Sequence, residues 1–235
     1  MNTPVIQISG VSKSYSGLRP LRIQALVVDK GERVAISGFD AAGAELLVNL
    51  ITGASLPDQG TIHTFGRATS DIEDGEAWIA SLERFGIVSP RAVMLEGSSL
   101  QSNLALPFTL EIDPVAPSVL PKVIALAREC GIARDDLSKQ VGDLPAHVRV
   151  RAHLARAVAL NPELLLIEHP TVDVAEDEKI RLAQDIAHVV HGRGASALVM
   201  TTDVEFAGAV AHRSLALQPA TGAMVPWKPK RGWFR

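Results

Sequence analysis

The sequence has a single cysteine, no excess of positive charge and no long apolar run. Cys130 has no second cysteine to pair with, so an internal disulfide is impossible, which fits a reducing compartment. The formal net charge of −3 gives no general attraction for nucleic acid. No stretch approaches the ~18 uninterrupted apolar residues of a membrane span. We see no signal peptide after Met1 and expect an intracellular chain.

What is present is enough apolar material for one large domain. The chain has 235 residues, of which 47% are hydrophobic. Short apolar runs alternate with amphipathic helical patterns, and this alternation predicts an α/β fold with a mostly parallel sheet. The expected strands are residues 5–9, 21–28, 34–36, 61–65, 85–89, 164–167, 197–200 and 214–217. The expected helices are residues 44–51, 72–84, 122–129, 148–160, 179–190 and 207–210.

A glycine loop lies between the strand at 34–36 and the helix at 44–51. Its glycines, Gly38 and Gly43, are separated by four residues. Strand, glycine loop and helix form the layout of a phosphate-binding P-loop, whose backbone N–H groups hold the anion. A working P-loop continues with Lys and then Ser or Thr. This chain has Ala44 and Glu45 there, so the pattern predicts the geometry without the cation.

Six segments follow one another along the chain: VSKSYSG, GERVAISG, LITGASLPDQGTIHTFG, SNLALP, HLARAVALNPELLLIEHPT and ALVMTTD. In this order they resemble the ATP-binding subunit of an ABC transporter over roughly residues 5–217. The resemblance implies a P-loop NTPase domain of the ABC type, with a mostly parallel core sheet, an antiparallel β subdomain and a helical insert. We assign residues 1–94 and 151–220 to the core and β subdomain and residues 95–150 to the helical subdomain. Within that insert, residues 108–121 carry three prolines and are interpreted as a linker.

The resemblance also implies positions for ATP and Mg²⁺. An aromatic residue stacks on adenine in this family, and the P-loop holds the phosphates. The matching positions are Tyr15, Gly38, Phe39, Asp40, Ala41, Ala42, Gly43, Ala44, Glu45 and Leu46.

Most chemical positions of the family carry a different residue here. Ala44 stands at the phosphate-binding lysine and Glu45 at the hydroxyl that holds Mg²⁺. Glu168 and His169 stand at the metal-binding aspartate and the general base of Walker B, and Thr202 stands at the switch histidine. The family's glutamine after residues 85–88 is replaced by SP, its signature motif by LPAHV, and the aspartate of the loop after Walker B is absent.

These replacements predict weak or absent ATP binding, doubtful Mg²⁺ binding and no retained catalytic residue. Two unit charges ~4 Å apart interact by about 4 kcal/mol at an effective dielectric constant of ~20. Losing the lysine and gaining Glu45 therefore lowers nucleotide affinity by orders of magnitude. We expect no metal site. Glu168 as a metal ligand and His169 as a base are open alternatives, and a histidine held by a hydrogen bond is favoured for His169.

One hypothesis concerns the anion that the loop would otherwise bind. The N-terminus of a helix favours negative charge. We expect Glu45 to supply that charge from within the chain, with Asp40 as the second candidate.

The leading functional interpretation is a degenerate ABC transporter subunit. It would dock on a membrane permease at the inner face of the cell membrane, form a homo- or heterodimer with an ABC subunit, and act structurally or as a regulator. The alternatives are a slow ATPase with atypical residues and a soluble pseudo-ATPase that binds a protein partner. The tail at 221–235 ends in WKPKRGWFR, whose four cations and three aromatics suit contact with anionic lipid or a partner. Of the two interpretations, a short disordered terminus is favoured.

Overall fold

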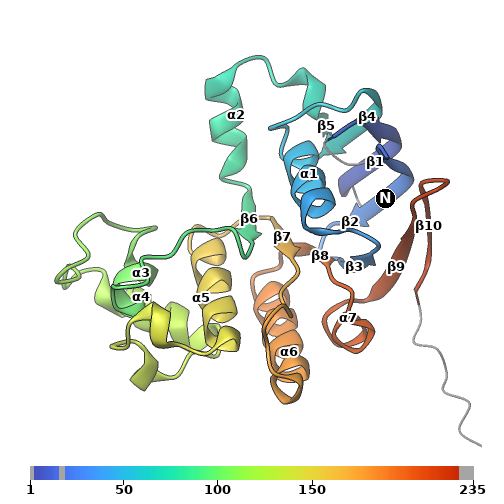
Figure 1. Ribbon diagram of the computed structural model, residues 1–235. Coiled ribbons are helices and arrows are strands. Elements are labelled where there is room, and N and C mark those ends of the chain that lie inside the picture. The colour runs from blue at the N-terminus through green and yellow to red at the C-terminus, as the bar shows by residue number, and fades with distance from the viewer. Residues whose placement is uncertain (1–2, 16–18, 228–235) are drawn as a thin grey trace, which may run out of the picture.

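The computed structural model of the chain describes residues 3–15 and 19–227, and its centre is a six-stranded sheet (Figure 1). The strand order is β10-β9-β3-β8-β7-β6. Neighbouring strands pair in parallel, except that β10 runs antiparallel to β9. The strands are β3 (Arg33–Ser37), β6 (Phe85–Val88), β7 (Leu164–Glu168), β8 (Ser196–Met200), β9 (Arg213–Gln218) and β10 (Ala223–Pro226). The parallel arrangement brings the carboxyl ends of β3, β8, β7 and β6 to one edge.

A second, antiparallel sheet is built mostly from the N-terminal third. Its order is β2-β1-β4-β5, and its strands are β1 (Pro4–Lys13), β2 (Leu21–Asp29), β4 (Gln59–Thr64) and β5 (Arg67–Ala68). The main-sheet helix α1 (Ala41–Ile51) lies beside this sheet, and α2 (Gly75–Leu82) projects from the same part of the molecule (Figure 1).

The remaining helices lie on the other side of the main sheet. Figure 1 shows α3 (Leu100–Ala105), α4 (Leu120–Glu129) and α5 (Ala146–Val158) grouped at one flank, with α6 (Glu176–Gly192) and α7 (Val204–Val210) next to them. None of the helices in the described part of the chain combines the length and apolar character needed to cross a bilayer.

Alternation along the buried strands divides the core into two clusters. Leu164 and Leu166 face α1, β1 and β2, whereas Leu165 and Ile167 face the helices on the opposite side. Successive side chains of a strand point to opposite faces, so a strand covered on both faces needs a continuous apolar run. All of β7 and β8 is buried, in agreement with that requirement. Cys130 is buried in the helix-side cluster.

The expected fold class is confirmed, but the interpretation of residues 108–121 as a linker is wrong. Val115 and Val119 are only 5% and 8% exposed and pack in the helix-side core. The Ser102 hydroxyl donates to the Ile112 carbonyl at 2.9 Å. The segment is irregular because of its prolines, yet its valines bury enough apolar surface to fix it. The division into subdomains stays a prediction, and its boundary at residue 150 falls inside α5. The tail beyond Trp227 lies outside the described residues.

Candidate functional site

The loop after β3 has the tight geometry that its glycines predict. Gly38 has φ of 92°, and a Cβ added there would lie 2.9 Å from the Leu217 carbonyl oxygen on β9. Any side chain would therefore strain the backbone and collide with the neighbouring strand. Glycine at this position lets the chain turn from β3 into α1 in contact with β9.

Asp40 caps the helix that follows the loop. Its backbone is extended, and the Gly43 N–H donates to Asp40 Oδ1 at 2.7 Å. An aspartate at the N-cap satisfies a free N–H group and complements the helix dipole. The hypothesis that Glu45 supplies this anion is wrong. The second candidate, Asp40, supplies it, because it precedes the first turn and reaches the Gly43 N–H.

The other loop side chains offer no cation. Ala44 is 0% exposed and packs in the apolar cluster beneath the loop with Ile36 and Leu47. Phe39 is buried in the same cluster and Leu46 packs against it. Ala41 and Ala42 are exposed at the start of α1 and have no polar side-chain atom.

Glu45 instead takes part in an ion-pair triad with Arg91 and Glu168. Arg91 Nη1 lies 2.5 Å from Glu45 Oε1, and Arg91 Nη2 donates to both carboxylate oxygens of Glu168 at 2.8 and 2.7 Å. The Glu168 side chain is 2% exposed, whereas those of Arg91 and Glu45 are 42% and 47% exposed. A buried carboxylate needs a partner of opposite charge. The guanidinium provides one, with Nη2 shared between both oxygens of Glu168 and Nη1 directed to Glu45.

Sheet topology brings these three residues together. Glu168 ends β7, and Arg91 follows the adjacent strand β6. Glu45 lies in α1, which follows β3 on the other side of β8. The Arg91 side chain thus reaches from the edge of the sheet across β7 to α1. In open α/β sheets, ligands bind outside the carboxyl ends of the strands, which is where this triad lies.

Sequence reasoning missed Arg91. Its partners were singled out, but as two isolated acidic replacements. The sequence did contain a signal for it. Two carboxylates stand at positions where the family binds one cation, and an arginine lies two residues after Ser89. A buried acidic residue near a second one requires a positive partner, and that requirement could have directed attention to Arg91.

His169 lies next to the triad in a strained conformation. Its φ is 44°, and its N–H donates to the Met200 carbonyl at 2.8 Å. Its Nε2 atom is buried and has no hydrogen-bond partner among the described residues. The favoured expectation of a side chain held by a hydrogen bond is therefore wrong for Nε2. Thr202 is exposed, and the next residue, Asp203, caps α7 through the N–H groups of its first turn.

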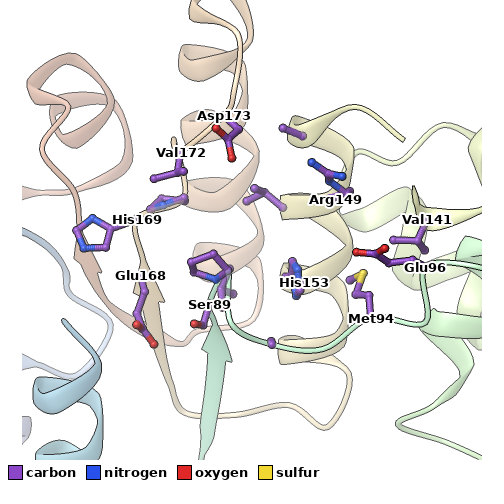
Figure 2. Close-up of a pocket in the computed structure, with 16 residues that line it drawn as sticks. Ser89, Met94, Glu96, Val141, Arg149, His153, Glu168, His169, Val172 and Asp173 are labelled. Atoms are coloured by element: carbon purple, nitrogen blue, oxygen red, sulfur yellow. The ribbon is translucent and has the colours of Figure 1, made fainter. Parts of the chain in front are cut away.

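A cavity of about 290 Å³ opens between the ends of β6 and β7 and the helix α5. Figure 2 shows His169 and Asp173 on one side of it and His153, Glu96 and Arg149 on the other. Burial, with the positive charges of Arg156 and Arg149, lowers the pKa of His153 to about 4, so its ring is neutral near pH 7. No group of three or more potential ligands for a metal ion occurs within residues 3–15 and 19–227.

A second hollow, of about 250 Å³, lies beside the loop that follows β3. Tyr15 lines it together with Arg22, Gly43 and Leu217. The structure therefore brings Tyr15 close to the P-loop positions, as the resemblance implied, while Glu168, His169 and Thr202 lie further along the same sheet edge.

The family model described as ABC transporter matches residues 21–172, which is more than half of the chain. The chain belongs to the ABC transporter family.

Individual relatives agree with this assignment at low identity. The phosphonates import ATP-binding protein PhnC of Anaeromyxobacter dehalogenans is 27% identical over 234 residues, a match that covers 96% of this chain and 46% of that protein. The macrolide export ATP-binding/permease protein MacB of Bdellovibrio bacteriovorus is 24% identical over 218 residues, covering 91% of this chain and 33% of that protein. The chain thus spans less than half the length of either relative.

A solved structure shows the same fold. The ATP-binding cassette MJ0796, in a dimeric post-hydrolysis state bound to ADP and Pi, superposes with a TM-score of 0.73 at 18% identity. The match covers 97% of this chain and all of that one.

Proposed function

We propose that this chain is a degenerate ATP-binding subunit of an ABC transporter, with weak or absent ATP binding and hydrolysis. It docks on a membrane permease at the inner face of the membrane, pairs with a second ABC subunit, and contributes structure or regulation. Family membership supports the transporter context, and the residues of the loop and triad support the loss of nucleotide chemistry.

The observation that carries this proposal is the state of the phosphate loop. The Gly43 N–H, which a phosphate would need, already donates to the Asp40 carboxylate. An incoming phosphate would meet this negative charge, and no lysine follows Gly43 to offset it. Asp40 therefore makes the N-terminus of α1 unfavourable for a polyphosphate, so nucleotide affinity is low.

The residues also do not suit a magnesium ion. Mg²⁺ prefers oxygen ligands in near-octahedral geometry and is usually held together with phosphate oxygens. The carboxylates of Glu45 and Glu168 are both engaged by the Arg91 guanidinium, whose positive charge repels a second cation. We therefore assign Mg²⁺ no role in this chain.

A groove on the helical side is the proposed permease contact. The groove has a volume of about 290 Å³. Its lining is mixed: the apolar residues Ile87, Ala92, Leu106, Pro107 and Ala157 lie beside the polar His153 and Arg156. The adjacent segment exposes Val93 by 77%. A groove with exposed apolar side chains at its rim suits an amphipathic segment of a partner protein.

One experiment tests binding and nucleotide dependence together. The tagged chain is captured from solubilised membranes of its own cells with the integral membrane protein that accompanies it, and the captured complex is titrated calorimetrically with Mg-ATP. We expect a permease to co-purify and no heat of binding below millimolar nucleotide. The Val93→Asp variant should lose the permease, because a carboxylate replaces an apolar contact.

Matched variants make the result decisive. Ile79→Asp changes an equally apolar side chain, 63% exposed, on the distant helix α2, and should retain the permease. Micromolar Mg-ATP binding by the unaltered chain would overturn the loss of nucleotide binding. ATPase activity abolished by Glu168→Gln would show an active cassette with atypical residues. Permease-free chain from every preparation would favour a soluble partner instead. Ala44→Lys with Glu45→Ser should raise nucleotide affinity.

A further inference from the structure

The segment between β6 and α3 is fixed to the rest of the molecule at alternate residues. Arg91 holds it to the core through Glu45 and Glu168. Two residues later, Arg156 on α5 donates from Nη1 to the Val93 carbonyl at 2.7 Å. The segment therefore connects the main sheet, α1 and α5.

The end of the segment is held in the same way. The Leu95 N–H donates to Asn103 Oδ1 at 2.8 Å, and Asn103 Nδ2 donates back to the Leu95 carbonyl at 3.0 Å. Asn103 is 0% exposed, so this pair of bonds is well shielded. Arg91 is thus the attachment on the core side, and Asn103 and Arg156 are those on the helical side.

We propose that Arg91 is a built-in cation that holds residues 89–95, and with them the groove beside Ala92, in one conformation without any metal or nucleotide. Its guanidinium supplies the positive charge that two converging carboxylates require. Because the cation is covalently part of the chain, it cannot dissociate. The groove beside residues 92 and 93 is then always formed, and partner binding does not wait for a ligand.

Charge and burial explain why the loss of this one side chain would affect the conformation of residues 89–95. Glu168 is 2% exposed, so its carboxylate has little water to replace a lost partner. Removing Arg91 leaves Glu168 and Glu45 as neighbouring unpaired anions. Relief requires either movement of residues 89–95 and α1 apart, or a new cation between them. Arg91 is therefore a positioning residue.

This inference rests on the proposed function in taking the groove as the permease contact, but its test does not depend on a permease. Amide hydrogen exchange is measured on the purified full chain. Arg91→Ala should raise exchange in residues 89–95 by about tenfold to a hundredfold, the range expected for losing hydrogen bonds to charged groups. Millimolar Mn²⁺ should restore protection in this variant, because the exposed pair of carboxylates can then share a divalent ion, and should leave the unaltered chain unchanged.

The chain offers a matched control at the opposite end of the same two strands. Arg84 Nε pairs with Glu163 at 2.6 Å, next to the amino ends of β6 and β7. Arg84→Ala removes an ion pair whose partners are 44% and 46% exposed, together with a cation–π contact to Phe65, and should leave exchange in residues 89–95 unaltered. Arg91→Ala with Glu45→Gln should loosen the segment but lose the rescue by Mn²⁺.

If Arg91→Ala does not fold, Glu45→Gln alone tests the same idea, because Glu45 is half exposed and its loss weakens only one arm of the triad. A smaller rise in exchange in residues 89–95 is then expected. Unchanged exchange in a folded variant, or rescue by Mn²⁺ that persists without Glu45, overturns the proposal. A micromolar affinity for Mg-ATP in the unaltered chain would overturn the proposed function and leave the exchange result standing.

Discussion

The buried strands of the main sheet and the loops at their carboxyl ends differ in what determines their residues. In β7 and β8 every residue is buried, and alternate side chains fill two separate cores. Beyond these strands, His169 has a buried nitrogen with no hydrogen-bond partner in the part of the chain that the structure describes, and Thr202 is exposed to solvent. Packing constrains the strands at each position, whereas beyond them buried residues such as Phe39 and Thr201 alternate with exposed ones.

The fold of a family can therefore persist while the chemistry at its sheet edge changes. An apolar strand residue contacts neighbours from several elements, and any change of volume is felt. A ligand-binding side chain in a loop is needed by the ligand and contributes little to the fold. In this chain the edge contains internal contacts of its own, namely the Asp40 cap and the Arg91 triad.

The largest expected effect tests the strand side of this comparison. Leu166→Ala removes a side chain that is 0% exposed in the centre of β7 and should lower the free energy of unfolding by about 2–5 kcal/mol. Thr202→Ala, in the loop after β8, should change it by less than about 0.5 kcal/mol. Urea unfolding followed by circular dichroism measures both. Equal effects would remove the distinction between strand and loop.

An intermediate loss of stability is expected at acid pH, because His153, which lines the cavity next to the triad, becomes protonated. The pKa of His153 falls from an ordinary 6.5 to about 4 on folding, so the unfolded chain binds more protons between these values. Stability from this group is complete above about pH 6.5 and is lost as the pH falls toward 4. The loss at pH 5 relative to pH 7.5 is roughly 2 kcal/mol. His153→Gln should flatten the curve of unfolding free energy against pH, and an identical curve would contradict this origin.

The smallest effect concerns the loop side. Asp40→Ala removes the cap of α1 and should destabilise the chain by about 1 kcal/mol. Asp74 caps α2 with the same geometry, accepting from the Ala77 N–H at 2.8 Å, but α2 has no buried residue. Asp74→Ala should therefore fray one helix with a smaller change in the midpoint of thermal unfolding. A larger loss at Asp74 would show that α1 depends little on its cap.

Most of the fold could be predicted because it is encoded locally. The apolar runs at 164–167 and 197–200 mark strands covered on both faces, and the structure extends them by one residue each, to Glu168 and from Ser196. Helix ends were less accurate. The expected helix at 72–84 begins instead at Gly75, because Asp74 caps it. The two-residue strand β5 is too short to leave a periodic pattern.

The candidate site could be predicted only in part. The glycine loop could be predicted from the spacing of Gly38 and Gly43, because the backbone geometry of a tight turn is a local property of the sequence. The triad was not, because its members come from three distant segments and their pairing depends on the order of strands in the sheet. The choice between Asp40 and Glu45 as the helix cap depends on which carboxylate can contact the free N–H groups of α1, and the sequence leaves that open.

Because Cys130 is buried, the single thiol of the sequence can be used to measure how often the folded chain opens locally. Burial raises the pKa of this thiol to about 12, so almost no thiolate forms near neutral pH while the chain is folded. A maleimide reagent can then label the protein only during openings that expose Cys130 at the C-terminal end of α4. The labelling rate reports opening events directly, in the absence of denaturant, and can rank every variant named above on one scale.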